Sequence, residues 1–227
     1  MLMVGGTQLD GNGDEVMYTT SSRGEWIALM APAHEIWTAI IPSQFNANCP
    51  SSVYCFQTGT SYAAPQAAGL ANLIWCLNPT GFNAQQVENF ILDGCETFTP
   101  YSAGDHGRGR INVFNSLALA SGNLWTRTPN PGTADLTNAF KAAGAASGAT
   151  VGFFYGSATG STTVQGCSLS VDIANASSLG TATAGANGAA VKNVFVPEEW
   201  STLTVYLQVV EYGNPCRKSN VVIYTFP

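Results

Sequence analysis

Two kinds of hydrophobic pattern divide the chain. In residues 63–77 nearly every side chain is small or apolar, and only Gln66 and Asn72 are polar interruptions. A helix that is apolar on all sides is a buried helix, so this stretch predicts a buried helix packed closely against a sheet. Residues 202–209 instead alternate apolar and polar side chains. That alternation predicts a half-buried strand.

Shorter patterns surround the predicted helix. The apolar runs 3–6 and 26–31 predict buried strands, and Pro32 ends the second. Asn78-Pro79 ends the helix, and Asn83 with Gln86 forms a capping-box pattern. A second helix is therefore expected, with Val87, Phe90 and Ile91 on one face and Gly94 at its end, followed by a short helix over 112–120.

Glycine and proline punctuate residues 122–132, and beyond them the periodicity changes to that of strands. We therefore predict two domains, residues 1–125 and 130–227. Strands are expected in the second domain at 149–155, 164–171, 190–196, 202–209 and 220–226. Several short strands at this spacing predict an antiparallel β-sandwich of about a hundred residues.

Composition excludes several classes of function. Only 10% of the 227 residues are charged, the net charge is −6, and no basic run is present, so nucleic acid is not an expected partner. No run of 18 apolar residues predicts a membrane span, and the first residues lack the pattern of a signal peptide. Low charge with abundant Gly, Ser, Thr, Asn and Ala is typical of secreted bacterial proteins.

The six cysteines show no zinc-binding spacing, which favours disulfides and an oxidising compartment. Cys167 and Cys216 fall in strand regions of one small domain, so we expect them to be bridged. Cys49 and Cys55 bracket a short loop and form a second expected pair. Cys76 and Cys95 remain by elimination, at opposite ends of a predicted helix.

Ser61 lies in the most informative stretch of the chain, residues 59–69. It would stand at the N-terminal end of the buried helix, beside unpaired backbone N–H groups and the positive end of the helix dipole. This position suits a nucleophile whose attack creates an oxyanion. The alternative is that Ser61 only caps the helix, as serines often do.

The pattern Gly-Thr-Ser-x-Ala-Ala-Pro-x-x-x-Gly of residues 59–69 resembles the nucleophile motif of the subtilisin-like serine peptidases, the subtilases. Three further segments are similar to that family: residues 4–6 with 18–24, residues 31–38, in which Ala33 replaces the usual glycine, and residues 107–113. The likeness covers about the first half of the chain. It implies an α/β fold, the C-terminal portion of a subtilisin-like parallel-sheet domain, followed here by the all-β antiparallel sandwich.

The resemblance also shows what this sequence lacks. The subtilase triad runs in the order Asp, His, Ser, and only 60 residues precede Ser61, with no matching Asp or His motif and no Ala-Ala-Gly-Asn segment for the oxyanion hole. We therefore expect an enzyme fragment that lacks the N-terminal half of its catalytic domain. The missing Asp and His would lie upstream.

Other polar residues have simpler roles. His34 lies in the Ala-Pro loop and His106 follows the serine, so either would require a rearranged triad to act as the base. The aspartates at 10, 14 and 105 lie in turn-like clusters, where local hydrogen bonds are their usual role. Arg108 and Arg110 are expected to be solvated or packed on the surface, and Glu198-Glu199 to form a charged turn.

The leading hypothesis is a secreted serine endopeptidase of subtilisin type that hydrolyses polypeptide substrates through an acyl-enzyme on Ser61. No cofactor is evident, since residues 9–14 read best as a plain turn, although the family resemblance leaves room for a structural calcium ion. The alternative is a catalytically inactive secreted protein, a subtilase relic whose sandwich serves adhesion or assembly.

Overall fold

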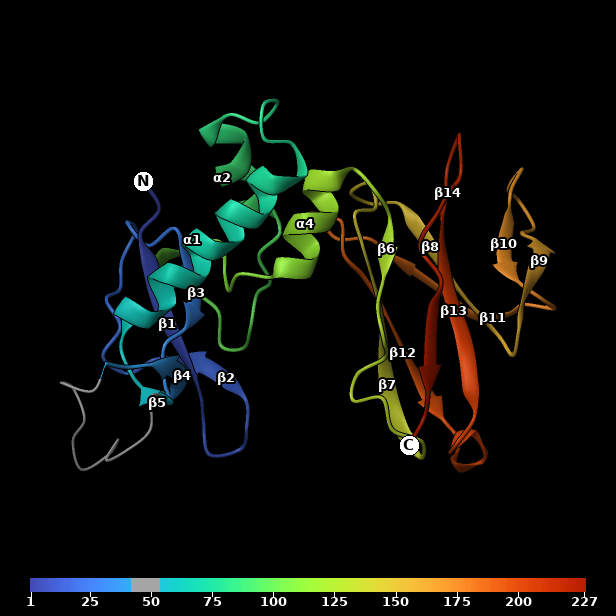
Figure 1. The fold of residues 1–227 in the computed structure, drawn as a ribbon, viewed down its shortest axis with the longest axis horizontal. Coiled ribbons are helices and arrows are strands. Elements are labelled where there is room, and N and C mark those ends of the chain that lie inside the picture. The colour runs from blue at the N-terminus through green and yellow to red at the C-terminus, as the bar shows by residue number, and fades with distance from the viewer. Residues whose placement is uncertain (42–53) are drawn as a thin grey trace. The chain divides into compact units, whose positions relative to one another are not determined.

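The computed structural model describes residues 1–41 and 54–227, and their contacts divide the chain into two compact units, Met1–Ser116 and Leu117–Pro227 (Figure 1). The fold is mixed α/β, and most strand pairs are antiparallel. The division falls within a helix, before the Gly-Pro segment 122–132 at which the sequence predicts a boundary. None of the helices in the described ranges is long and apolar enough to cross a membrane.

The first unit is built on a three-stranded sheet of order β2-β1-β3. Its strands are β1 (Val4–Leu9), β2 (Glu15–Met17) and β3 (Leu29–Pro32), and β1 pairs with β3 in parallel. A separate antiparallel pair follows, β4 (Ile36–Ala39) with β5 (Tyr54–Gln57). The helices are α1 (Thr60–Leu77), α2 (Ala84–Asp93) and α3 (Ala103–His106), and α4 (Val113–Ser121) spans the division.

Helix α1 packs against β1 and β3 along one face only (Figure 1). Its buried residues are Ala63, Ala67, Leu70 and Ile74, which recur at the spacing of a single helix face. Other apolar residues of the helix are not covered, since Leu73 and Leu77 are 50% and 48% exposed. The prediction of a helix buried on all sides is therefore wrong for the part of the chain described here, because the sheet covers one face and α2 only part of the rest.

The second helix confirms its sequence signals. The Asn83 side chain accepts a hydrogen bond from the Gln86 N–H at 2.9 Å, and the Gln86 side chain accepts one from the Asn83 N–H at 2.9 Å. Val87 and Ile91 are buried. Gly94 follows the helix with a φ of −77°, which any residue can adopt. Glycine is required here because of space, since an added Cβ would lie 2.2 Å from the Ser116 Oγ.

The second unit contains two larger sheets and a hairpin. A five-stranded sheet has the order β11-β8-β13-β14 with β15 also beside β13, a three-stranded sheet has the order β12-β7-β6, and β9 pairs with β10. The bounds are β6 (Trp125–Thr126), β7 (Leu136–Ala143), β8 (Thr150–Gly156), β9 (Thr159–Thr163), β10 (Ser170–Ile173), β11 (Ser177–Thr183), β12 (Ala190–Val196), β13 (Thr204–Tyr212), β14 (Arg217–Lys218) and β15 (Val222–Thr225).

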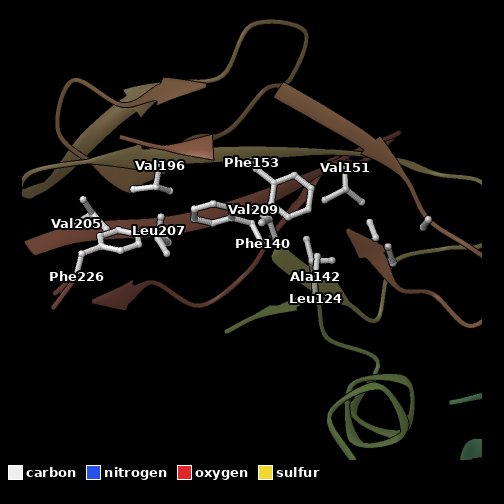
Figure 2. Close-up of a cluster of buried hydrophobic side chains, with 13 residues drawn as sticks. Leu124, Phe140, Ala142, Val151, Phe153, Val196, Val205, Leu207, Val209 and Phe226 are labelled. Carbon is white, nitrogen blue, oxygen red and sulfur yellow. The ribbon is translucent and has the colours of Figure 1, made fainter. Parts of the chain in front are cut away.

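One hydrophobic core draws side chains from both larger sheets, including Phe140 and Ala142 of β7 and Phe153 of β8 (Figure 2). Strand β13 serves two cores, because successive side chains of a strand point to opposite faces. Val209 belongs to this core, whereas Val210 packs with Val171 and Ile173 beneath the β9–β10 hairpin.

The strand predicted at 164–171 is largely wrong. Most of this segment is the turn between β9 and β10, where the Cys167 N–H donates to the Val164 carbonyl at 3.1 Å and Gly166 has a φ of +84°. A glycine in that conformation breaks the extended backbone that the apolar residues suggest. The strands predicted at 149–155, 190–196, 202–209 and 220–226 all correspond to strands of the structure.

The cysteines meet the predictions in part. Cys167 and Cys216 are bridged, with Cα atoms 5.9 Å apart, as predicted. Cys55 is also disulfide-bonded, and Cys49, its expected partner, lies outside the described residues. The predicted pairing of Cys76 with Cys95 is wrong, because both are thiols. Cys76 is exposed near the end of α1, whereas Cys95 is buried after α2. Burial raises the pKa of the Cys95 thiol to about 12, and its Sγ donates to the Ile91 carbonyl.

Removing the disulfide should destabilise the second unit. The bridge closes a loop across a sequence separation of 49, worth about 4 kcal/mol on the chain-entropy model. The double variant Cys167→Ala/Cys216→Ala should therefore lose roughly that much free energy of unfolding in urea titrations. Cys76→Ala, which changes an exposed thiol of the first unit, is the control and should leave the urea midpoint of the second unit unchanged. An unchanged midpoint in the double variant would contradict the prediction.

The segment before residue 130 should contribute to the stability of the second unit. Leu124 is 4% exposed in the shared core, and the Thr126 N–H donates to the Asn220 side chain at 2.9 Å. Burial of one leucine is worth about 2–5 kcal/mol by comparison with alanine. A fragment of residues 117–227 should therefore unfold at clearly higher urea than one of residues 130–227. Equal midpoints for the two fragments would contradict this role for Leu124.

Candidate active site

Ser61 is the second residue of α1, and its side chain is exposed. The residue before the helix, Gly59, has a φ of +147° and donates its N–H to the Ala33 carbonyl at 2.7 Å. A Cβ on Gly59 would lie 3.3 Å from the Ser61 Oγ. Both the backbone conformation and the space around the hydroxyl therefore favour glycine at this position.

The start of α1 leaves backbone N–H groups available. Gly59 occupies the N-cap position and no side chain caps the helix, so the alternative that Ser61 acts as the cap is not supported. The Tyr62 N–H donates to the Gly59 carbonyl at 2.9 Å. Within residues 1–41 and 54–227, the N–H groups of Thr60 and Ser61 donate no hydrogen bond. Together with the helix dipole, these groups favour a negative charge beside Ser61.

The helix start is held against the sheet by close contacts. A Cβ on Gly6 of β1 would lie 2.5 Å from the Ala33 Cβ and 3.3 Å from the Thr60 Cγ2, so these three segments meet without room for a side chain at Gly6. The Gln66 side chain donates to the Pro32 carbonyl at 2.7 Å and to the Tyr62 carbonyl at 2.8 Å. Gln66 thus ties α1 to the end of β3.

This positioning role of Gln66 was not recognised from the sequence. Its signal was present, because Gln66 is one of two polar residues in an otherwise apolar stretch. A lone polar side chain on a packed helix usually has a hydrogen-bonding partner.

His34 lies in the loop after β3 and is exposed, with its ring 6.0 Å from the Tyr18 ring between centroids. Beside it, the Glu35 N–H donates to the Thr58 Oγ1 at 3.0 Å, which joins this loop to the segment before α1. No hydrogen bond links Ser61 to His34, or to any carboxylate, in the part of the chain that the structure describes. A base already engaged with Ser61 is therefore not found among these residues.

His106 is buried and held by contacts within the first unit. It is 6% exposed, its Nδ1 accepts a hydrogen bond from the Ser102 N–H at 2.9 Å, and its ring lies 5.0 Å from the Phe98 ring and 5.8 Å from that of Tyr101. Burial lowers the pKa of His106, so the neutral imidazole is favoured. This histidine holds the turn at α3.

The charged candidates also have local partners. Arg110 pairs with Glu15 at 3.0 Å and with Glu96 at 3.1 Å, so it links β2 to the segment after α2 rather than lying free on the surface. Arg108 pairs with Asp93 at 3.5 Å, and both side chains are mostly exposed. The Asp10 carboxylate accepts the N–H groups of residues 12 and 14, as expected of a turn.

Metal-binding side chains do not gather in the described ranges, where no group of three or more His, Cys, Asp or Glu residues could hold an ion.

A comparison with known protein families matches the first part of the chain. The model of the subtilase family matches residues 1–112, a segment that contains Ser61, Gln66 and the sheet on which α1 packs. A comparison with curated proteins found no match.

Lowering the pH should reduce the stability of the fold, because of His106. Its pKa in the folded state lies below the value of 6.5 expected when unfolded, so the unfolded chain binds the proton more readily. The free energy of unfolding should therefore decrease as pH falls below about 6.5, until the lowered folded pKa is passed. In His106→Gln this part of the pH dependence should be smaller, as measured by urea titrations between pH 7.5 and 5. His34→Gln is the matched control, and an identical pH profile in parent and His106→Gln would contradict the assignment.

Proposed function

Because the model of the subtilase family matches residues 1–112, we propose that Ser61 is the nucleophile of a serine endopeptidase that acts on polypeptides. The observation that supports this role is the exposed Ser61 hydroxyl at an uncapped helix N-terminus within the matched segment. A family match alone does not assign a residue, and this geometry is what supports the proposal for Ser61.

The proposed chemistry follows from that position. The Ser61 Oγ attacks the scissile carbonyl carbon, a C–O bond forms, and the carbonyl oxygen becomes an oxyanion. The Ser61 N–H and the positive end of α1 stabilise that charge. Collapse of the intermediate breaks the C–N bond, releases the amine and leaves an acyl-enzyme that water hydrolyses.

The attacking hydroxyl needs a base to take its proton. No such group contacts Ser61 in the described part of the chain, so the mechanism requires a histidine and an orienting aspartate from elsewhere. In subtilisin, loss of the triad histidine alone lowers kcat by about 2 × 10⁶. The 227-residue chain by itself is therefore expected to be close to background in peptide hydrolysis.

The same observation favours a second candidate, a catalytically inactive relic of the family. In that case the first unit would serve as a scaffold, and the second unit would carry the function in adhesion or assembly. The two candidates differ in whether Ser61 is ever activated.

The second unit and the location complete the proposal. We take the two larger sheets, which share one hydrophobic core, as an accessory β-sandwich. The Cys167–Cys216 disulfide and the low content of charged residues support a secreted protein.

The decisive test compares the 227-residue chain with a form extended upstream by the Asp and His motifs of the family. Both would be treated with a fluorophosphonate probe and with casein. We expect near-background reaction of the short chain, strong labelling and cleavage by the extended form, and loss of both by about 10⁴-fold or more in its Ser61→Ala variant.

Ser22→Ala is the matched control, because Ser22 is another exposed serine of the first unit. Activity of the extended form that survives Ser61→Ala would remove Ser61 from the mechanism. An extended form that folds but neither labels nor cleaves would favour the inactive relic. Robust cleavage by the short chain, lost in Ser61→Ala, would show that one of its own histidines acts as the base.

A further inference from the structure

The second unit contains an open cavity of about 300 Å³ where β8 ends, β11 begins and β13 begins. Its wall includes Tyr155, Trp200 and Leu203 together with the polar residues Ser157, Asn175 and Ser177. A concave site with an apolar wall and a few converging polar groups has the general character of a small-ligand site.

Two aromatic rings form the apolar wall and are held in place. The Tyr155 and Trp200 rings lie 4.8 Å apart between centroids at an angle of 42°, and Trp200 also meets Phe226 at 5.7 Å. Trp200 ends the 3-10 helix Glu198–Trp200, and its carbonyl accepts the Leu203 N–H at 2.9 Å. Both rings also pack against the shared core, so their orientation is fixed before any ligand arrives.

Apart from Thr204, whose hydroxyl bonds to that of Thr225 at 2.7 Å, the polar side chains of the cavity have no hydrogen-bonding partner among the described residues. No hydrogen bond is formed there by the Asn175 amide, the hydroxyls of Ser157 and Ser177, the Tyr155 hydroxyl or the Trp200 indole N–H. By contrast, the buried Asn138 and Gln208 of the same unit are bonded through both their amide oxygen and nitrogen. The cavity therefore offers an amide, hydroxyls and an indole N–H to whatever occupies it.

The wall of the cavity carries no charged side chain, so an anion or a cation finds no counter-ion there. A pyranose has a face of C–H groups that packs on an aromatic ring, and a rim of hydroxyls that both donate and accept hydrogen bonds. These are the two kinds of surface that Trp200 with Tyr155 and Asn175 with the two serines present. We propose that this cavity binds a neutral saccharide, a function of the second unit that does not depend on Ser61.

Asn175 supports this assignment through its backbone. Its φ is +46°, an unusual conformation for a residue other than glycine, although asparagine tolerates it better than most. The side chain is exposed and makes no hydrogen bond that would stabilise this conformation. Asn175→Gly therefore removes the amide without straining the backbone, which makes it a clean probe of binding.

The test is calorimetric titration of the full 227-residue chain with cellopentaose, maltopentaose and chitopentaose. At least one should bind with a Kd below about 1 mM. Tyr155→Phe and Asn175→Gly should each weaken that binding about tenfold, because each removes a hydrogen-bonding group, and Trp200→Phe should weaken it further.

Tyr206→Phe is the matched control. It removes a tyrosine hydroxyl from β13 on the opposite face of the same sheet, where Tyr206 packs with the second cluster, and it should bind as the parent does. Absence of binding to all three saccharides at about 10 mM would overturn the proposal, as would equal binding by parent and all cavity variants. Binding of a casein-derived peptide that is lost in the same variants, without saccharide binding, would overturn it as well.

Discussion

The first unit depends on a contact in which β1, the loop after β3 and the start of α1 meet at Gly6. An alanine there would bring its Cβ to 2.5 Å from that of Ala33, which no packed structure tolerates without a shift of the backbone. The same loop accepts the Gly59 N–H, and Gln66 binds the end of β3. The position of Ser61 is thus set by contacts of its neighbours, because its own side chain forms no hydrogen bond in the described structure.

Features encoded by local spacing could be predicted from the sequence. The capping box at Asn83 and Gln86, the alternation over 202–209 and the motif around Ser61 each need only a short window. The pairing of Cys167 with Cys216 was predicted from their place in one small domain, and it holds although Cys167 lies in the turn between β9 and β10 and not in a strand.

The remaining features depend on what lies next to a segment in space. Leu73 and Leu77 are apolar in the sequence whether or not another element covers them, so their exposure could not be predicted. Strand β11 consists mostly of small and polar residues and gains its place by pairing with β8. The cavity is the extreme case, because Tyr155, Asn175 and Trp200 come from separate segments and none carries a motif.

The contrast between the two thiols has a practical consequence for studying this molecule. At neutral pH the buried Cys95, with a pKa of about 12, holds almost no thiolate, the form that reacts with alkylating labels. Cys76 is exposed on the last turn of α1, so among the described cysteines it is the one that a maleimide dye or spin label can reach. The chain therefore carries a built-in attachment point on the helix that bears Ser61, from which fluorescence or spin resonance can follow whatever covers its exposed apolar face.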